Sequence, residues 1–170
     1  AGVGMALGLE KAFASSAANA DKRGRVVGVL GDSTFIHGGI GGLIDMVYNR
    51  TASTIIIVDN RTTAMTGFQD HPGTGKTLMG ETTHALDLEE LCRAVGVESV
   101  RVVDPWDLAA TEEAVREEVG ADRTSVIISR RACTLRERAE RPAFRVQEEE
   151  CTGCKKCMRL GCPALVMRGD

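Results

Sequence analysis

The run STIIIVDN, residues 53–60, constrains the fold more than any other part of the chain. Its apolar residues are β-branched and lack the polar alternation of a half-exposed strand, which is typical of a parallel strand buried on both faces. Shorter strand patterns at 25–30, 99–104 and 124–129 alternate with helical patterns. This alternation predicts an α/β fold, with a doubly wound, mostly parallel sheet and helices on both faces. The helical patterns cover residues 1–18, 38–49, 87–96 and 106–120.

A long segment, residues 61–84, carries no periodicity and is rich in Thr, Gly and Pro. Loops of this length inside a compact domain are usually functional or disordered. The segment contains DHPGTGKT, residues 70–77, which differs by one residue from an ATPase phosphate loop. Asp70 stands where that loop needs its first glycine, and the flanking residues show neither a buried strand nor a clear helix. We therefore disfavour a P-loop NTPase and expect a loop that covers a cofactor or substrate.

The composition limits the possible partners. With 43% hydrophobic and 26% charged residues, the 170-residue chain can form one compact core and a small appendage. Lys and Arg total 21 against 24 Asp and Glu, without a basic stripe, which argues against nucleic acid. No apolar run approaches a bilayer span, and residues 1–9 lack the basic leader of a signal peptide. We expect a cytoplasmic protein without a membrane partner, and a chain that is part of something longer.

Four cysteines near the end of the chain suggest a metal centre. Cys151, Cys154 and Cys157 form C-x2-C-x2-C, and Cys162 is followed by Pro163. Thiolates at this spacing can converge from one tight loop, and the pattern is typical of [4Fe–4S] ligands, with a zinc knuckle or a disulfide framework as the alternative. Four residues separate the third and fourth cysteines, where the bacterial ferredoxin pattern has three. The cluster is therefore either incomplete in this chain or closed locally by Cys162.

Polar residues follow two of the expected strands. Gly31 and Asp32 come directly after one strand, and Asn60 ends the next. In an open parallel sheet both would project from the carboxyl edge, where ligands bind. A carboxylate, an amide oxygen and a nearby carbonyl are ligands that Mg²⁺ accepts together with phosphate oxygens. We also interpret HGGIGG, residues 37–42, as the glycine-rich start of a helix whose N–H groups can approach a phosphate.

Four motifs together resemble a known family. They are GDSTFIHGGIGGL, VDNRTTAMTGFQ, HPGTGKT and CTGCKKCMRLGCPAL. They are similar to the C-terminal half of the large subunit of indolepyruvate ferredoxin oxidoreductase, one of the thiamine-diphosphate-dependent 2-oxoacid:ferredoxin oxidoreductases. The resemblance covers residues 1–170. It implies a thiamine-diphosphate-binding domain at 1–145, followed by the start of a ferredoxin-type [4Fe–4S] domain at 146–170.

The resemblance also implies roles for individual residues. Asp32, Asn60 and the carbonyl of Thr62 would hold the Mg²⁺ that anchors the diphosphate. His37 would either contact the reacting substrate or have a structural role. The remaining positions implied to bind the cofactor are Gly31, Ser33, Gly38, Thr66, Gly67 and Gln69.

The implied reaction is the oxidative decarboxylation of an aryl pyruvate to an acyl-coenzyme A, with electrons passing through [4Fe–4S] clusters to ferredoxin. The implied partners are a small (β) subunit, ferredoxin, the 2-oxoacid and coenzyme A, in an oligomer. The glutamate that activates the cofactor in this superfamily comes from a separate domain, so we expect the isolated chain to be inactive. A pyruvate or other 2-oxoacid enzyme and a non-enzymatic iron–sulfur electron-transfer module remain the alternatives.

Overall fold

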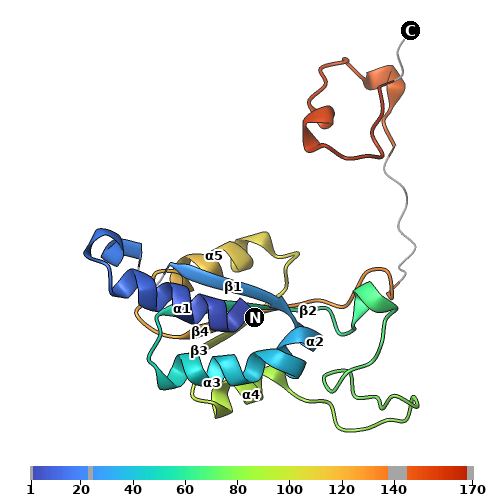
Figure 1. The fold of residues 1–170 in the computed structure, drawn as a ribbon. Helices are drawn as coiled ribbons and strands as arrows, with labels where there is room; N and C mark the ends of the chain where they lie inside the picture. The colour runs from blue at the N-terminus through green and yellow to red at the C-terminus, as the bar shows by residue number, and fades with distance from the viewer. Residues whose placement is uncertain (1, 23–24, 138–144, 168–170) are drawn as a thin grey trace. The chain divides into compact units, whose positions relative to one another are not determined.

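The computed structural model describes residues 2–22, 25–137 and 145–167. It divides the chain into two compact units, residues 1–138 and 139–170 (Figure 1). The boundary expected after residue 145 stays a prediction. Within the described ranges, no helix is long and apolar enough to cross a membrane.

The first unit is built on a four-stranded parallel sheet with the order β1-β2-β4-β3. The strands are β1 (Val26–Gly31), β2 (Ser53–Asp59), β3 (Ser99–Val103) and β4 (Ser125–Arg130). The continuous run at 53–59 is therefore a central strand paired on both sides, as its β-branched composition predicts. This register brings the ends of β2 and β4 together, with Asp59 opposite Arg130.

Helices lie on both faces of the sheet, as expected for a doubly wound fold (Figure 1). The helices α1 (Gly2–Ala14), α3 (Ile40–Tyr48) and α4 (Leu88–Ala94) enclose the main core with side chains of the sheet, while α5 (Leu108–Glu118) packs on the other face. Cys92 is fully buried in that core, and burial raises the pKa of its thiol to about 12. It is a packing residue.

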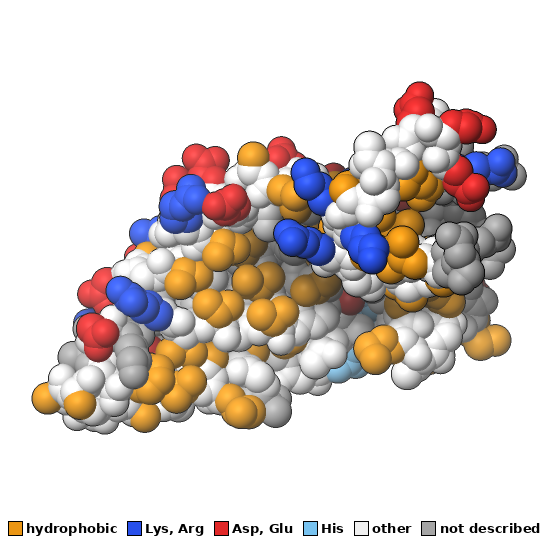
Figure 2. Space-filling view, turned by 90° about the horizontal axis from the view of Figure 1, so that it is seen from above, with side chains coloured by type: hydrophobic (Ala, Val, Ile, Leu, Met, Phe, Trp, Pro, Cys, Tyr) orange, Lys and Arg blue, Asp and Glu red, His pale blue; other side chains and the backbone are white. Residues whose placement is uncertain are grey.

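The face that carries α5 is only partly covered. Val27, Val29 and Val58 are 38%, 60% and 43% exposed, and the register of β1 and β2 places them on one side of the sheet. Figure 2 shows apolar side chains gathered on the side of the molecule seen from above.

The helix after β1 begins earlier than the sequence indicates. Asp32 directly follows the strand and opens α2 (Asp32–Thr34), which continues through a π-helical turn (Phe35–Gly39) into α3. The prediction that residues 37–42 start the helix was therefore wrong. Gly39 and Gly42 instead allow close packing, since a Cβ on Gly42 would lie 3.1 Å from the Val3 side chain.

The second unit is described at 145–167. It contains two short 3₁₀ helices, Glu148–Glu150 and Cys157–Leu160, and no strand within those residues. The expected ferredoxin-like fold is not confirmed there.

Candidate functional site

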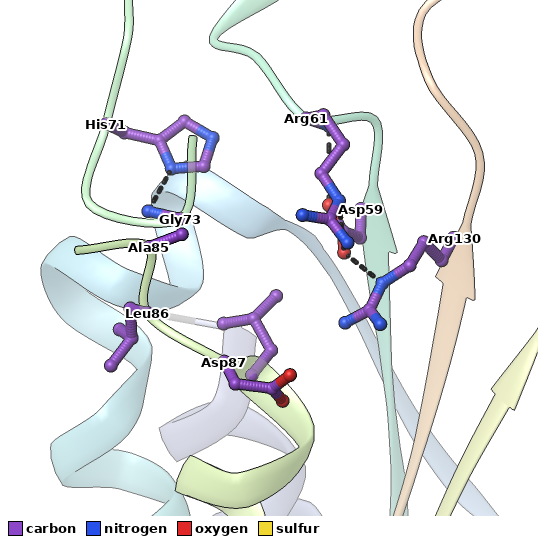
Figure 3. A pocket seen from close by; sticks show the side chains of 9 residues that line it. Asp59, Arg61, His71, Gly73, Ala85, Leu86, Asp87 and Arg130 are labelled. Carbon is purple, nitrogen blue, oxygen red and sulfur yellow. Dashed lines mark hydrogen bonds and ion pairs between the residues drawn. The ribbon is translucent and has the colours of Figure 1, made fainter. Parts of the chain in front are cut away.

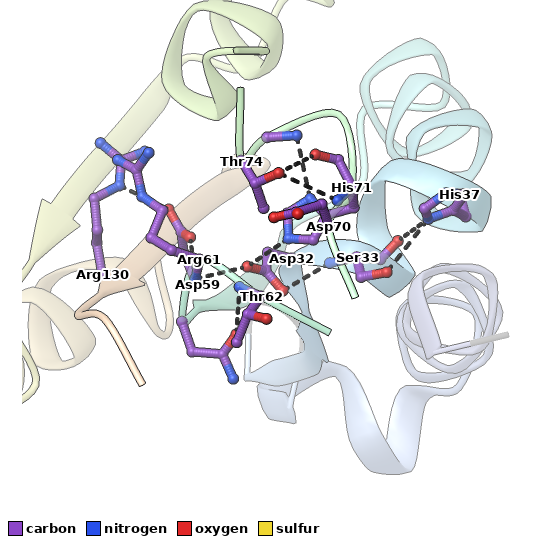
Figure 4. Close-up of polar contacts among 12 residues, drawn as sticks. Asp32, Ser33, His37, Asp59, Arg61, Thr62, Asp70, His71, Thr74 and Arg130 are labelled. Atoms are coloured by element: carbon purple, nitrogen blue, oxygen red, sulfur yellow. Dashed lines mark hydrogen bonds and ion pairs between the residues drawn. The ribbon is translucent and has the colours of Figure 1, made fainter. Parts of the chain in front are cut away.

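The ends of β1 and β2 meet at the carboxyl edge of the sheet (Figure 4). The backbone N–H of Arg61, the residue after Asn60, donates to Asp32 Oδ2 at 3.1 Å. The Asp32 side chain therefore contacts the backbone directly after Asn60, although the two residues are far apart in the sequence. The expected proximity of these two strand ends is therefore observed, and a Mg²⁺ site between them stays a prediction.

Asn60 shapes the turn that follows β2. Its Oδ1 accepts the Thr62 N–H at 3.1 Å, and its carbonyl accepts the Cys133 N–H at 3.1 Å. Arg61, held between them, has a left-handed φ of 60°. The Thr62 Oγ1 is buried without a hydrogen-bond partner, and such an orphaned polar atom marks a place where a further polar group can be accommodated.

Asp32 is a buried carboxylate, only 3% exposed. Its Oδ1 accepts the Ser33 N–H at 2.7 Å. Burial raises the pKa of Asp32, and the nearby carboxylate of Asp59 adds to this, although the Ser33 N–H and His71 oppose it. A buried anion next to a second carboxylate is a position at which a cation lowers the electrostatic energy.

Asp59 is neutralised from two sides. Its Oδ2 accepts the Nε–H of Arg130 at 2.7 Å and lies 3.6 Å from Arg61 Nε (Figure 3). These residues line a small cavity of about 70 Å³ over the start of α4. The sequence placed Asp59 beside Asn60 at this strand end but predicted no role for it, and Arg130, which ends the neighbouring strand, was missed.

His71 is a further residue at this site, and the sequence did not link it to Asp32. It is 5% exposed, and its Nε2 lies 3.2 Å from Asp32 Oδ2. It reaches the site from the long loop, 39 positions away along the chain. No spacing rule links such a loop residue to a strand end.

Three expected cofactor-loop residues lie in one closed turn. Thr66 Oγ1 donates to Gln69 Oε1 at 2.6 Å, and Gln69 Nε2 donates to the Thr66 carbonyl at 2.6 Å. Gly67 sits between them with a φ of 119°, and the Thr63 N–H closes the turn on the Gln69 carbonyl. The side chains are exposed.

His37 and Gly38 lie in the π-helical turn rather than at a helix N-terminus. The ring of His37 is exposed, with Nδ1 2.7 Å from the carbonyl of Ser33. This contact orients the ring through Nδ1. A contact between His37 and substrate, or between Gly38 and a cofactor, stays a prediction.

The segment that resembles a phosphate loop forms a hairpin. Lys76 pairs with Thr82 in an antiparallel bridge, and Thr83 N–H donates to the Gly75 carbonyl at 3.0 Å. The next helix, α4, begins only at Leu88. A phosphate loop needs a helix directly after its Lys-Thr pair, so the segment is not one.

The four clustered cysteines are exposed and free. Across the described residues, no group of three or more Cys, His, Asp or Glu side chains is arranged to hold a metal. Two features nevertheless suit a cluster site. Cys151 and Cys157 line one cavity, and the Lys156 N–H beside the Cys154 sulfur lowers the pKa of that thiol.

The Mg²⁺ donor set fits the edge of the sheet. Asp32 has a buried carboxylate, Asn60 has an amide oxygen, and the backbone carbonyl of Thr62 belongs to the same turn. These are hard oxygen ligands of the type that Mg²⁺ prefers.

An open cavity of about 390 Å³ lies beside Asn60, and the charges that line it are mixed. Its cations are Arg61, Lys76 and Arg136, and its carboxylates are Asp70 and Glu137. Arg136 lies 3.6 Å from Asp70, which leaves Arg61 and Lys76 as the cations that suit phosphate oxygens.

Comparison with known proteins shows the family of the chain. The family described as "Thiamine pyrophosphate enzyme, C-terminal TPP binding domain" matches residues 1–129. The chain belongs to this family.

The chain is also similar to curated proteins named indolepyruvate oxidoreductase subunit IorA. The relative from Pyrococcus horikoshii is 40% identical over 95% of this chain and 26% of its own length. The relative from Methanothermobacter marburgensis is 45% identical over 84% of this chain and 23% of its own length. The relative from Thermococcus kodakarensis is 38% identical over 97% of this chain and 27% of its own length. The resemblance expected from the motifs is confirmed, and the chain spans about a quarter of these relatives.

Proposed function

We propose that this chain is the cofactor-binding and electron-transfer part of an indolepyruvate ferredoxin oxidoreductase. In this proposal the complete enzyme decarboxylates an aryl pyruvate oxidatively, passes electrons to ferredoxin and transfers the acyl group to coenzyme A. The observation that carries the proposal is the meeting of Asp32 with the Asn60–Thr62 turn at the carboxyl edge of a parallel sheet.

The chain's own residues would bind and orient the cofactor. Asp32, Asn60 and the Thr62 carbonyl would hold Mg²⁺, and the cations Arg61 and Lys76 would face the diphosphate side of the open cavity. When bound, thiamine diphosphate supplies the carbanion chemistry that decarboxylates a 2-oxoacid. The closed turn with Thr66, Gly67 and Gln69, together with Gly31 and Ser33 on either side of Asp32, would complete the cofactor contacts.

The second unit would carry the electrons. Cys151, Cys154, Cys157 and Cys162 would ligate a [4Fe–4S] cluster, in a complex with a small β subunit and with ferredoxin as acceptor. The donor set fits iron chemically, and cluster binding would have to draw the four exposed thiols together. A cytoplasmic location is part of the same proposal.

Two alternatives make different predictions. An electron-transfer module would bind iron and sulfide but not thiamine diphosphate. A pyruvate or other 2-oxoacid enzyme would bind both cofactors and differ only in the substrate it oxidises.

The test is 2-oxoacid-dependent dye reduction with indolepyruvate and with pyruvate. We expect turnover, with preference for indolepyruvate, when the chain is part of the complete large subunit assembled with its β subunit. We expect none from the isolated chain, because an activating glutamate from a second domain is required. Robust turnover by the isolated chain would contradict the proposal, and preference for pyruvate in the assembled enzyme would favour the alternative substrate.

A further inference from the structure

We propose that His71 is a positioning residue that holds the carboxylate of Asp32 ready for its cation and ties the hairpin at 72–86 to the cofactor site. The inference rests on the proposed function and deepens it, because it names a residue outside the cofactor's expected ligands.

The hydrogen bonds define which ring nitrogen of His71 carries hydrogen. The backbone N–H of Gly73 donates to Nδ1 at 3.1 Å (Figure 3), so Nδ1 acts as an acceptor. The ring hydrogen is therefore on Nε2, which lies 3.2 Å from Asp32 Oδ2. His71 thus donates to the carboxylate and fixes the direction in which one of its oxygens points.

The ring has little room to turn. It is 5% exposed, and a Cβ added to Gly73 would lie 3.1 Å from its Cε1 and 3.4 Å from Ile36 Cδ1. His71 therefore lies against the Gly73 backbone on one side. A side chain held in this way can position the Asp32 carboxylate rather than follow its motion.

His71 also belongs to the base of the hairpin. Its carbonyl accepts the Thr74 N–H at 2.8 Å, and the Pro72 carbonyl accepts the Leu86 N–H at 2.9 Å. Further along, Lys76 and Thr82 form the antiparallel bridge. Displacement of the hairpin would move the ring and remove its hydrogen bond to Asp32 Oδ2, while the Arg61 N–H would stay in place.

The test compares Mg²⁺ affinity at saturating thiamine diphosphate, measured by calorimetry, in three variants of this chain. His71→Phe keeps a ring but removes both nitrogens, and His71→Gln keeps an N–H that can reach Asp32. His84→Phe changes an exposed histidine of the same segment and is the matched control. We expect His71→Phe to weaken Mg²⁺ binding about 10- to 100-fold, as losses of such outer-shell partners do, with most of the affinity recovered in His71→Gln and no change in His84→Phe.

Hydrogen exchange on the metal-free variants tests whether His71 holds the hairpin against the cofactor site. The backbone amides of residues 73–86 should exchange faster in His71→Phe than in His71→Gln. Wild-type Mg²⁺ affinity in a folded His71→Phe would overturn the inference alone. No Mg²⁺-dependent binding by the wild-type chain would overturn the proposed function and the inference together.

A measurement without any variant covers the case in which His71→Phe does not fold. Nitrogen NMR of the wild-type imidazole should show the hydrogen on Nε2, both with and without Mg²⁺ and thiamine diphosphate. Hydrogen on Nδ1 in the loaded chain would show that His71 does not donate to Asp32 and would overturn the inference.

Discussion

The Nε–H of Arg130 donates to Asp59 Oδ2 at 2.7 Å, from the end of β4 to the end of β2. Asp59 is 3% exposed, and its charge lies near the buried carboxylate of Asp32. Arg130 therefore compensates one of two neighbouring anions at the edge where the cofactor site is assembled.

Removal of this compensation should destabilise the fold. We expect Arg130→Ala to lower the free energy of unfolding by about 1–3 kcal/mol, because buried Asp59 loses a short hydrogen bond to a charged group and keeps only the longer contact with Arg61 Nε at 3.6 Å and the Arg61 N–H. Urea denaturation of the cofactor-free chain measures it. The control is Arg116→Ala, since Arg116 pairs with Glu112 at an exposed site and should cost less than about 0.5 kcal/mol. Equal losses in the two variants would refute the role of Arg130.

The helix start at Asp87 gives a pH-dependent prediction. Asp87 Oδ1 accepts the N–H groups of Glu89 and Glu90 at 2.7 and 3.0 Å, and the Glu90 bond is the main cause of its lowered pKa. We expect Asp87→Ala to cost about 1 kcal/mol at neutral pH. Because the folded pKa is lowered, this stabilisation is present above about pH 4, the ordinary aspartate pKa, and is lost as the pH falls through the folded value. Urea denaturation of both proteins across this pH range measures the difference in unfolding free energy. If the wild type stays more stable than Asp87→Ala well below the folded pKa of Asp87, the prediction is wrong.

Two adjacent glycines in α3 should respond differently to alanine. A Cβ on Gly41 would meet nothing within 4 Å, whereas one on Gly42 would lie 3.1 Å from Val3. We expect Gly41→Ala to raise the free energy of unfolding by about 0.5–1 kcal/mol through its better helix propensity, and Gly42→Ala to lose that gain because α1 must move. Thermal denaturation of both variants checks this. Similar gains in both would mean that Gly42 does not set the α1–α3 contact.

The cysteine motif makes a separate prediction. After anaerobic treatment with iron and sulfide, we expect the absorption and paramagnetic signals of a [4Fe–4S] cluster. They should be lost in Cys154→Ser and kept in Cys92→Ser, since Cys92 is fully buried in the core of the first unit. A further variant, Cys162→Ser, decides whether Cys162 closes the cluster locally. A zinc-only site, or a cluster that survives Cys154→Ser, would contradict the assignment.

Most of the fold follows from the sequence because its strands are short, apolar and separated by helical patterns. The continuous run of β2 indicates a central parallel strand, which places Asp32 and Asn60 at one edge. The start of the following helix was missed because Gly-Asp-Ser-Thr is typical of a turn and the later glycines suggest a helix start. In the structure Gly42 serves helix packing against Val3 instead.

The side-chain contacts within the site were harder to predict than the strands. The Asp59–Arg130 contact depends on the strand order, which places β4 beside β2, and local patterns do not give that order. The His71–Asp32 contact depends on the path of a long loop without periodicity. Both are tertiary contacts between residues with no fixed spacing in the sequence.

The central claim is that the carboxyl edge binds thiamine diphosphate through Mg²⁺. Calorimetric titration of thiamine diphosphate into this chain, with and without Mg²⁺, tests it most directly. We predict binding that requires Mg²⁺, is lost in Asp32→Ala and in Asn60→Ala, and is unchanged in Asp45→Ala, which alters an exposed carboxylate of α3. No binding by the wild-type chain, or binding that neither Mg²⁺ nor Asp32 affects, would contradict the account.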